Sequence, residues 1–409
     1  MIDSGSVAWM IVATALVLFM TPGLAFFYGG LVRGKNVIST IMYSFISMGV
    51  VSIVWLLWGY SLAFGTAADE AATGINNLIG NFDFIGFRDV SASEGDGIPD
   101  MLFATFQMMF AIITPALITG AFAERFKFST YLIFLVLWVT FVYVPICHWV
   151  WAGDGWILGI GAADFAGGTV VHINAGVAAI AAAYLVGKRR NVERGVEPHN
   201  VPFVVLGAAI LWIGWFGFNA GSGLAADGVA VNAFLVTNMA AAVAAVTWGI
   251  ISYVQTGRMS AVGVASGAVA GLVAITPAAG SVGPMGSLAV GLGAGVFCYV
   301  AVQLRHRFKI DDALEVFAVH GVGGIWGAIA TAIFAVGGVG LIDGDANLLW
   351  ANFRAVVATI GWSLIVTTII LLALDKIPGL GLRAETVEED TGLDLSMHGE
   401  RAYVADGAD

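Results

Sequence analysis

Two histidines, His172 and His320, lie inside long apolar stretches of a chain that otherwise keeps its charged residues outside such stretches. Each follows an aspartate by eight residues, in the segments 164–172 (DFAGGTVVH) and 312–320 (DALEVFAVH). An imidazole can donate or accept a hydrogen bond, relay a proton or ligate a metal. Because an ionisable side chain at membrane depth is costly, it indicates by default a substrate or proton pathway. Two such histidines in two halves of one chain suggest a pore built from an internal repeat.

Other roles for these histidines have to be weighed. A lone intramembrane histidine can simply hydrogen-bond between helices, although the repeated Asp-His spacing disfavours that reading. A zinc site needs three or four ligands, and no third buried His, Cys or carboxylate stands at ligand spacing. A bis-histidine haem would need room for a macrocycle in a closely packed, Gly-rich bundle. We therefore expect no metal and no other cofactor, and a membrane redox protein is the competing hypothesis.

The composition places the chain in the membrane class. Its 409 residues are 59% hydrophobic and only 11% charged, with a mean hydropathy of +0.90, whereas soluble domains carry about 25% charged residues. The net charge of −11 argues against nucleic-acid binding, which needs a basic face. Cys147 and Cys298 lie in separate apolar runs, so we expect small core residues and no disulfide or metal framework. Transmembrane helices must therefore position the histidines.

Eleven stretches meet the length of about 20 mostly apolar residues that a membrane span needs. The first is read as a retained helix, because Asp3 precedes it and no Lys or Arg does, unlike the start of a signal peptide. The shortest stretch is the eighth. The predicted helices lie near 7–31, 38–64, 100–123, 128–150, 168–187, 202–222, 229–255, 260–276, 286–304, 314–337 and 352–375.

The loops between these helices predict the orientation. Fifteen of the 17 basic residues fall in one set of loops and in the C-terminal tail, and only Arg88 and Arg354 fall in the other set. The positive-inside rule makes the first set cytoplasmic. We therefore expect an extracellular N-terminus, a cytoplasmic C-terminus, a transmembrane domain over 1–376 and a cytoplasmic tail over 377–409.

The helix count also predicts the repeat. Helices 1–5 and 6–10 would form two five-helix halves of opposite orientation around a central pore, with the eleventh helix outside the repeat. Inverted repeats place their site near the bilayer midplane, at the interface of the two halves. His172 and His320 belong to the last helix of each half, so they can meet there.

The sequence resembles the ammonium transporter (Amt/Mep/Rh) family, in its prokaryotic Amt form, over nearly the whole chain. The segment 164–176 (DFAGGTVVHINAG) is similar to the family signature, and several further motifs follow in the family's order. These motifs are 21–30 (TPGLAFFYGG), 106–110 (FQMMF), 120–125 (GAFAER), 212–222 (WIGWFGFNAGS), 319–324 (VHGVGG) and 392–403 (GLDLSMHGERAY).

The resemblance implies a site for the cation at the outer end of the pore. It assigns substrate recruitment to Trp151, Phe110, Phe218 and Ser222, with the two phenylalanines as a gate beneath the site. An aromatic face attracts a cation and a serine oxygen accepts a hydrogen bond from ammonium. The alternative is a purely structural role, in which the tryptophan anchors the chain at the membrane interface and the phenylalanines face lipid or core.

For the histidines, the resemblance implies two imidazoles touching edge to edge along a narrow hydrophobic pore, able to bind ammonia or relay a proton. It gives Asp164 a structural role near the start of the fifth helix, where carboxylates cap free backbone N–H groups. Asp312 is its counterpart on the cytoplasmic side.

The expected function is ammonium transport and not catalysis: NH4+ is recruited, loses its proton, and NH3 passes the histidines with or without that proton. The alternative is a sensor whose tail carries the function by docking a PII-type signalling protein. The resemblance also implies a homotrimer in the plasma membrane, in contact with lipid.

Four further histidines receive no functional assignment. His199, His306 and His398 are expected in loops or the tail, and His148 is expected to be hydrated at the outer interface. The acidic segment 385–390 is interpreted as a solvated face of the tail.

Overall fold

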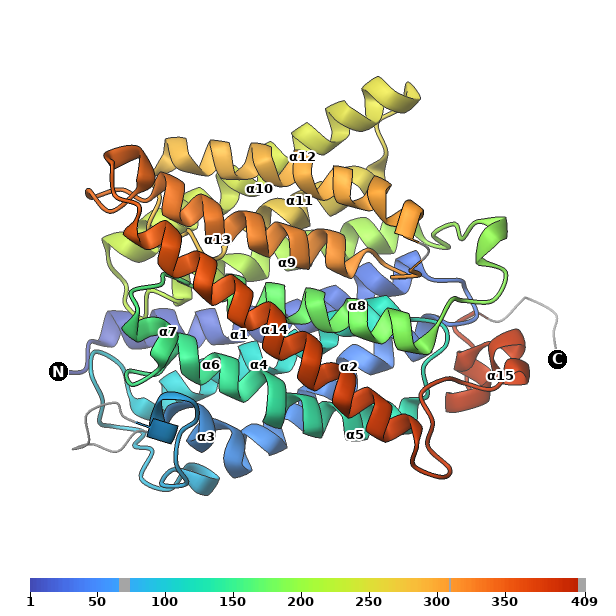
Figure 1. Ribbon diagram of the computed structural model, residues 1–409, viewed down its shortest axis with the longest axis horizontal. Helices are drawn as coiled ribbons and strands as arrows, with labels where there is room; N and C mark the ends of the chain where they lie inside the picture. The colour runs from blue at the N-terminus through green and yellow to red at the C-terminus, as the bar shows by residue number, and fades with distance from the viewer. Residues whose placement is uncertain (66–73, 309, 404–409) are drawn as a thin grey trace.

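The computed structural model describes residues 1–65, 74–308 and 310–403, and the regular elements in those residues are all helical. Ten helices long and apolar enough to cross a membrane form one bundle, and the shorter helix α11 (Ala261–Ile275) lies among them (Figure 1). Helix α1 begins at one end of the bundle, and the last described helical segments, within 386–398, lie at the other (Figure 1). The predicted all-α membrane fold is confirmed.

Several of the membrane-crossing rods are composite, because a π-helical stretch interrupts or begins the α-helix. In chain order the rods are α1 (Ser4–Leu31); α2 (Val37–Val54), η1 (Trp55–Gly59) and α3 (Tyr60–Phe64); α4 (Asp100–Phe122); α5 (Phe128–Trp138), η4 (Val139–Tyr143), α6 (Val144–Trp151) and α7 (Trp156–Gly159); η5 (Gly168–Ile173) and α8 (Asn174–Val186); α9 (Val201–Gly221); α10 (Gly228–Thr256); α11; α12 (Pro284–Phe308); η7 (Phe317–Gly321) and α13 (Val322–Phe334); and α14 (Asn347–Asp375).

Short polar side chains fix where many of these helices begin. The Asp3 carboxylate accepts a hydrogen bond from the Ser6 N–H at 2.7 Å, and Asp227 accepts from the first N–H groups of α10. Asn200 and Ser260 cap α9 and α11 in the same way. Each cap satisfies N–H groups that lack a partner within the helix.

The predicted spans differ from the observed helices in two respects. The eighth segment forms a helix of only 15 residues, shorter than the about 20 that cross a bilayer, and a turn follows it. The fourth rod continues beyond residue 150, because α7 follows α6 after a break at 152–155. Neither difference moves the histidine-bearing helices.

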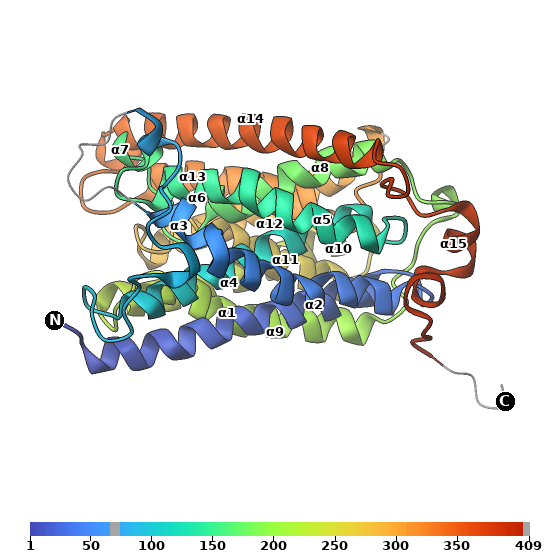
Figure 2. The same cartoon turned by 90° about the horizontal axis from the view of Figure 1, so that it is seen from below.

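The bundle is organised around close helix pairs. Helix α1 packs along α9, where a Cβ on Gly207 would collide with the backbone of Phe27 and one on Gly30 with the backbone of Asn200. Helix α14 crosses one face of the bundle diagonally (Figure 1) and lies on the side opposite α1 and α9 (Figure 2). The rods η5–α8 and η7–α13 contact each other between these layers.

The tail packs against the end of the bundle through α15 (Thr386–Thr391) and η9 (Asp394–His398) (Figures 1 and 2). The Asp394 carboxylate accepts a hydrogen bond from the Ser39 N–H at 2.8 Å, and Lys35 Nζ donates to the Glu389 carbonyl at 2.7 Å. The Glu389 side chain is buried and paired with Arg383. The interpretation of segment 385–390 as a fully solvated face is therefore wrong at Glu389.

Candidate functional site

The two histidines meet in the interior of the bundle. His172 lies in η5 and His320 in η7, and their side chains are buried, with 1% and 3% exposure. The Nδ1 atoms are 3.3 Å apart, the ring planes differ by 26°, and the ring centroids are 5.3 Å apart. With the nitrogens so close and the centroids so far apart, the rings meet edge to edge.

Glycines let the two helices approach this closely. Gly176 lies one turn after His172, and a Cβ there would collide with the backbone of Gly321, the residue that follows His320. A Cβ on Gly324 would similarly meet Ile173 and the Gly168 carbonyl, at 2.9 and 3.0 Å. The contact between the imidazoles therefore depends on backbones that cross without side chains between them.

The Nδ1 contact couples the protons of the two rings. In a neutral pair one Nδ1 donates and the other accepts. The donating ring therefore has a bare Nε2, and the accepting ring carries its only ring proton on Nε2. The His172 Nε2 is buried and has no hydrogen-bond partner among the described residues. The pair thus offers one donor and one acceptor to a small molecule beside it.

Two aromatic rings stack on His172. Phe218 lies over His172, with the centroids 5.9 Å apart and the planes 21° apart, and Trp215 lies over it at 5.4 Å and 23°. The Trp215 indole donates to Thr276 Oγ1 at 2.8 Å, which fixes its orientation. Sequence reasoning missed Trp215, although it lies within the 212–222 motif.

The predicted recruitment residues lie together next to this ring stack. Phe110 packs on Phe218 with centroids 4.3 Å apart, and Trp151 meets Phe110 edge-on at 5.7 Å. Ser222 lies one turn after Phe218 and donates its hydroxyl proton to the Phe218 carbonyl at 2.8 Å. Its oxygen lone pairs can still accept a hydrogen bond from a ligand. Phe110, Trp151 and Phe218 are called the outer aromatic group below.

The Asp164 carboxylate caps the segment that carries His172. Its Oδ1 accepts from the N–H groups of Gly167 and Gly168 at 2.9 and 2.6 Å, and its Oδ2 accepts from the Thr169 N–H at 2.7 Å and from the Thr169 hydroxyl. The Asp164 carbonyl accepts from the Trp151 indole at 2.9 Å. One residue therefore joins the outer aromatic group to the histidine-bearing helix.

Asp312 occupies the equivalent place before the second histidine. It is fully buried, and its Oδ2 accepts from the Phe317 N–H, the first of η7, at 2.7 Å. Burial raises the pKa of this carboxyl, and the backbone N–H bonds oppose that shift. Each aspartate lies eight residues before a histidine and caps the start of the π-helical segment that carries it.

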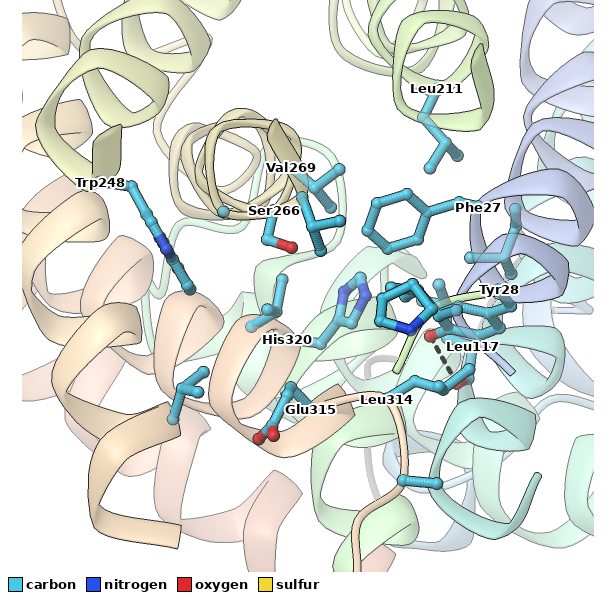
Figure 3. Close-up of a pocket in the computed structure, with 18 of the residues that line it drawn as sticks. Phe27, Tyr28, Leu117, Leu211, Trp248, Ser266, Val269, Leu314, Glu315 and His320 are labelled. Carbon is cyan, nitrogen blue, oxygen red and sulfur yellow. Dashed lines mark hydrogen bonds between the residues drawn. The ribbon is translucent and has the colours of Figure 1, made fainter. Parts of the chain in front are cut away.

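Both histidines line a cavity of about 590 Å³, whose lining also includes Arg189 and Val192 from the connection between α8 and α9. Tyr28, Trp248, Leu314, Glu315 and His320 surround it in Figure 3, and the Tyr28 hydroxyl donates to the Leu117 carbonyl at 3.0 Å. Its lining also includes polar and charged side chains such as Ser260, Arg305 and Glu315. Both histidines and Phe218 of the outer aromatic group line the same cavity, which is called the inner vestibule below.

The sequence matches the model of the Ammonium Transporter Family over residues 8–403. The chain belongs to the ammonium transporter family. It is 47% identical to the ammonium transporter of Bacillus subtilis (strain 168), over 98% of both chains. It is 45% identical to the ammonium transporter Amt1 of Archaeoglobus fulgidus, over 98% of this chain and 100% of that one.

Solved structures of family members have the same architecture. The crystal structure of Saccharomyces cerevisiae Mep2 matches with a TM-score of 0.87 and 38% identity, over 94% of this chain and 91% of that one. A structure titled "Sensor Amt Protein" matches with a TM-score of 0.88 and 33% identity, over 96% and 98%. The chain is thus an ammonium transporter with multiple membrane crossings, and it is a transporter rather than an enzyme.

Two of the other histidines lie elsewhere than predicted. His148 is completely buried in this ammonium transporter and not hydrated, because both ring nitrogens contact backbone carbonyl oxygens. His306 belongs to the last turn of α12 and not to a loop, since that helix continues to Phe308. His199 and His398 lie in the connection before α9 and in the tail, as expected.

In the described parts of this transporter, no three His, Cys, Asp or Glu side chains are grouped as metal ligands. Cys147 and Cys298 are free and fully buried, as predicted for small core residues.

Proposed function

We propose that this transporter recruits NH4+ at the outer aromatic group and Ser222, removes its proton, and passes NH3 along His172 and His320. The observation that carries the proposal is the buried contact between the two Nδ1 atoms, 3.3 Å apart, beside Phe218 of the outer aromatic group and in the wall of the inner vestibule. It leaves one donor and one acceptor for a neutral molecule in an apolar passage.

The cost of charge supports a neutral permeant. An ammonium ion that enters a dry passage unpaired loses several kcal/mol of hydration. The pKa of ammonium is similar to that of a lysine side chain, about 10.4, and burial can lower the pKa of such a cation by about 3–5. Potassium cannot release a proton or donate hydrogen bonds, so the same passage excludes it.

Recruitment has its own physical basis. A desolvated cation on an aromatic face gains about 2 kcal/mol or more, and Phe110, Trp151 and Phe218 pack as one group. Phe110 and Phe218 lie between Trp151 and His172, which suits a gate beneath the site. Asp164 and Asp312 act as structural caps of the two histidine segments and do not bind the substrate.

Transport by His172→Ala and His320→Ala, each alone, tests the proposal. The protein is reconstituted in liposomes on a solid-supported membrane, and currents and internal pH are recorded after ammonium and potassium pulses. We expect the unmodified chain to respond to ammonium alone and each variant to lose selectivity while retaining flux. A pH change without current would assign neutral NH3 conduction, and a current would assign net NH4+ transport. Variants as selective as the unmodified chain would contradict the histidine role.

A second candidate function is ammonium sensing through the tail, with a PII-type signalling protein as partner. Two observations favour it: the likeness to a structure titled "Sensor Amt Protein", and the packing of the tail on Lys35 and Ser39. Deleting 377–409 separates the two functions. Normal uptake with lost signalling would place signalling in the tail, whereas lost uptake would make the tail part of the transport machinery.

The assembly and placement of the chain complete the proposal. We infer a homotrimer in the plasma membrane, with a transmembrane domain over 1–376, a cytoplasmic tail over 377–409 and an extracellular N-terminus. The distribution of basic residues favours this orientation. Exposed apolar side chains such as Val231 and Phe234 leave faces for lipid or for neighbouring subunits. The mass of the detergent-solubilised protein, measured by light scattering, distinguishes a trimer from a monomer.

A further inference from the structure

His148 has an arrangement of partners that a neutral imidazole cannot satisfy. It is fully buried in α6, its Nδ1 lies 2.8 Å from the Ala63 carbonyl oxygen, and its Nε2 lies 2.7 Å from the Asn76 carbonyl oxygen. A neutral ring carries one N–H and one bare nitrogen, so it can donate to one carbonyl only. The other contact would then set a nitrogen lone pair against an oxygen lone pair. Only the imidazolium donates to both.

Asp154 provides the matching negative charge. Its Oδ1 lies 3.5 Å from His148 Nε2, and among the described residues this buried oxygen has no hydrogen-bond partner. A buried imidazolium without a counter-charge is costly, and the Asp154 side chain, which is 14% exposed, lies close enough to provide that charge. The ion pair accounts for both groups, which are otherwise unexplained in this part of the protein.

The two carbonyl groups are suited to a cation. Ala63 lies in the last turn of α3, and Asn76 lies in the short helix η2 (Gly74–Asn77). The last carbonyl groups of a helix lack partners within it and carry a partial negative charge. A doubly protonated ring placed between two such ends satisfies both with one side chain.

The neighbours of His148 connect its contacts with Ala63 and Asn76 to the outer aromatic group. The next residue, Trp149, donates its indole N–H to the Leu78 carbonyl at 2.8 Å, so two consecutive residues hold segment 76–78. Trp151 belongs to the same short helix, and its indole donates to the Asp164 carbonyl on the other side. Helix α6 is therefore fixed from two directions, with Trp151 at its end.

We propose that His148, donating from both ring nitrogens and paired with Asp154, holds α3 and segment 76–78 against α6 and thereby positions Trp151. It is a positioning residue, because it contacts the backbone and not the substrate. The expected effect on transport rests on the proposed recruitment role of Trp151. The protonation of both His148 ring nitrogens is independent of that role.

The charge is tested by solid-state NMR on the unmodified chain in liposomes. The sequence has two cysteines, and only Cys147 precedes a histidine. Labelling with carbonyl-13C cysteine and 15N histidine therefore identifies His148 through one unique peptide bond. We expect protons on both ring nitrogens at pH 7. A single protonated ring nitrogen would overturn the proposal, whatever the transport data show.

The positioning is tested with His148→Gln and with the double variant His148→Gln/Asp154→Asn, which leaves no unpaired buried charge. His398→Gln, in the tail, is the matched control. With methylammonium as the probe, we expect KM to rise about threefold or more, the effect of a weakened cation–π contact, while maximal current and potassium exclusion are retained. The control should keep the unmodified KM. An unchanged KM in folded, monodisperse variants would overturn the positioning role but not the recruitment by Trp151.

Discussion

The carboxylate of Asp164 acts on the candidate site through the backbone of the segment that carries His172. It accepts hydrogen bonds from Gly167, Gly168 and Thr169, at the start of the segment that ends in His172. These N–H groups would otherwise be unsatisfied, and a buried unsatisfied donor costs about 1–3 kcal/mol.

We therefore predict that Asp164→Asn destabilises the protein by about 1–3 kcal/mol and abolishes transport. An amide offers one acceptor oxygen instead of two, and its NH2 group would face backbone N–H groups that need an acceptor. Thermal unfolding in detergent and ammonium-evoked currents measure the two effects. Asp96→Asn, at an exposed loop position, is the control and should change neither. An active, equally stable Asp164→Asn protein would show that the cap is dispensable.

Asp311 allows a prediction about pH. Burial alone would raise the pKa of this carboxyl, but its hydrogen bonds with Arg189 and the charges of Arg189 and Arg125 hold it at about 2, below the ordinary 3.8. A lowered pKa in the folded state means stability that is fully present above pH 3.8 and lost as the pH falls through 2.

Asp311→Asn should accordingly cost about 2 kcal/mol at pH 7, since one pKa unit corresponds to about 1.4 kcal/mol. The difference from the unmodified chain should shrink below pH 4. Unfolding midpoints between pH 7 and pH 3 provide the measurement. A difference that stays constant over this range would mean that the charge of Asp311 is not what stabilises the fold.

At single residues, the sequence predicts identity better than environment. The Asp-His spacing singled out His172 and His320, whose side chains meet in the structure, because ionisable residues at two matching positions in apolar stretches are visible in the sequence. His148 was misjudged, because its partners Ala63 and Asn76 lie 85 and 72 positions away. No local pattern encodes such contacts.

At the scale of elements, the helices were predicted from hydropathy but their π-helical stretches were not. Both histidines lie in such stretches, η5 and η7, and π-helical turns occur often at functional sites. Hydropathy reports that a segment is buried, whereas the exact winding depends on the aspartate cap and on the neighbouring helix. The 15-residue α11 is a similar case, because its end depends on a turn within the bundle.

The crossing of the two histidine helices yields a prediction at this scale. Gly176→Ala places a Cβ against the backbone of Gly321, so the helices must separate and the imidazole contact must lengthen. We expect destabilisation by about 1–3 kcal/mol and lost discrimination between ammonium and potassium. The control is Gly361→Ala in α14, where nothing lies within 4 Å of the added Cβ, and it should be neutral or stabilising by up to about 1 kcal/mol. Unchanged selectivity in Gly176→Ala would contradict this view of the crossing.

For the whole molecule, the loop charges and the structure agree that the basic residues predicted to be cytoplasmic lie at the same end of the bundle. Arg33 and Arg189 pair with Glu124, Arg189 also pairs with Asp311, and Lys35 holds the tail. The loop charges predicted this grouping. They could not predict that the tail packs on the bundle, because contacts such as Asn36 with Leu393 join positions 357 residues apart.

The orientation in the membrane leads to a prediction that needs no transport assay. Because Cys147 and Cys298 are fully buried, a cysteine introduced at an exposed position is the one that a membrane-impermeant maleimide reaches. Basic residues stay on the cytoplasmic side, so Ser4→Cys should be labelled in intact cells and Arg401→Cys only after permeabilisation. The unmodified chain is the control and should remain unlabelled in both conditions. Labelling of Arg401→Cys in intact cells would reverse the orientation and would place the wide vestibule, not the aromatic group, on the outer side of the membrane.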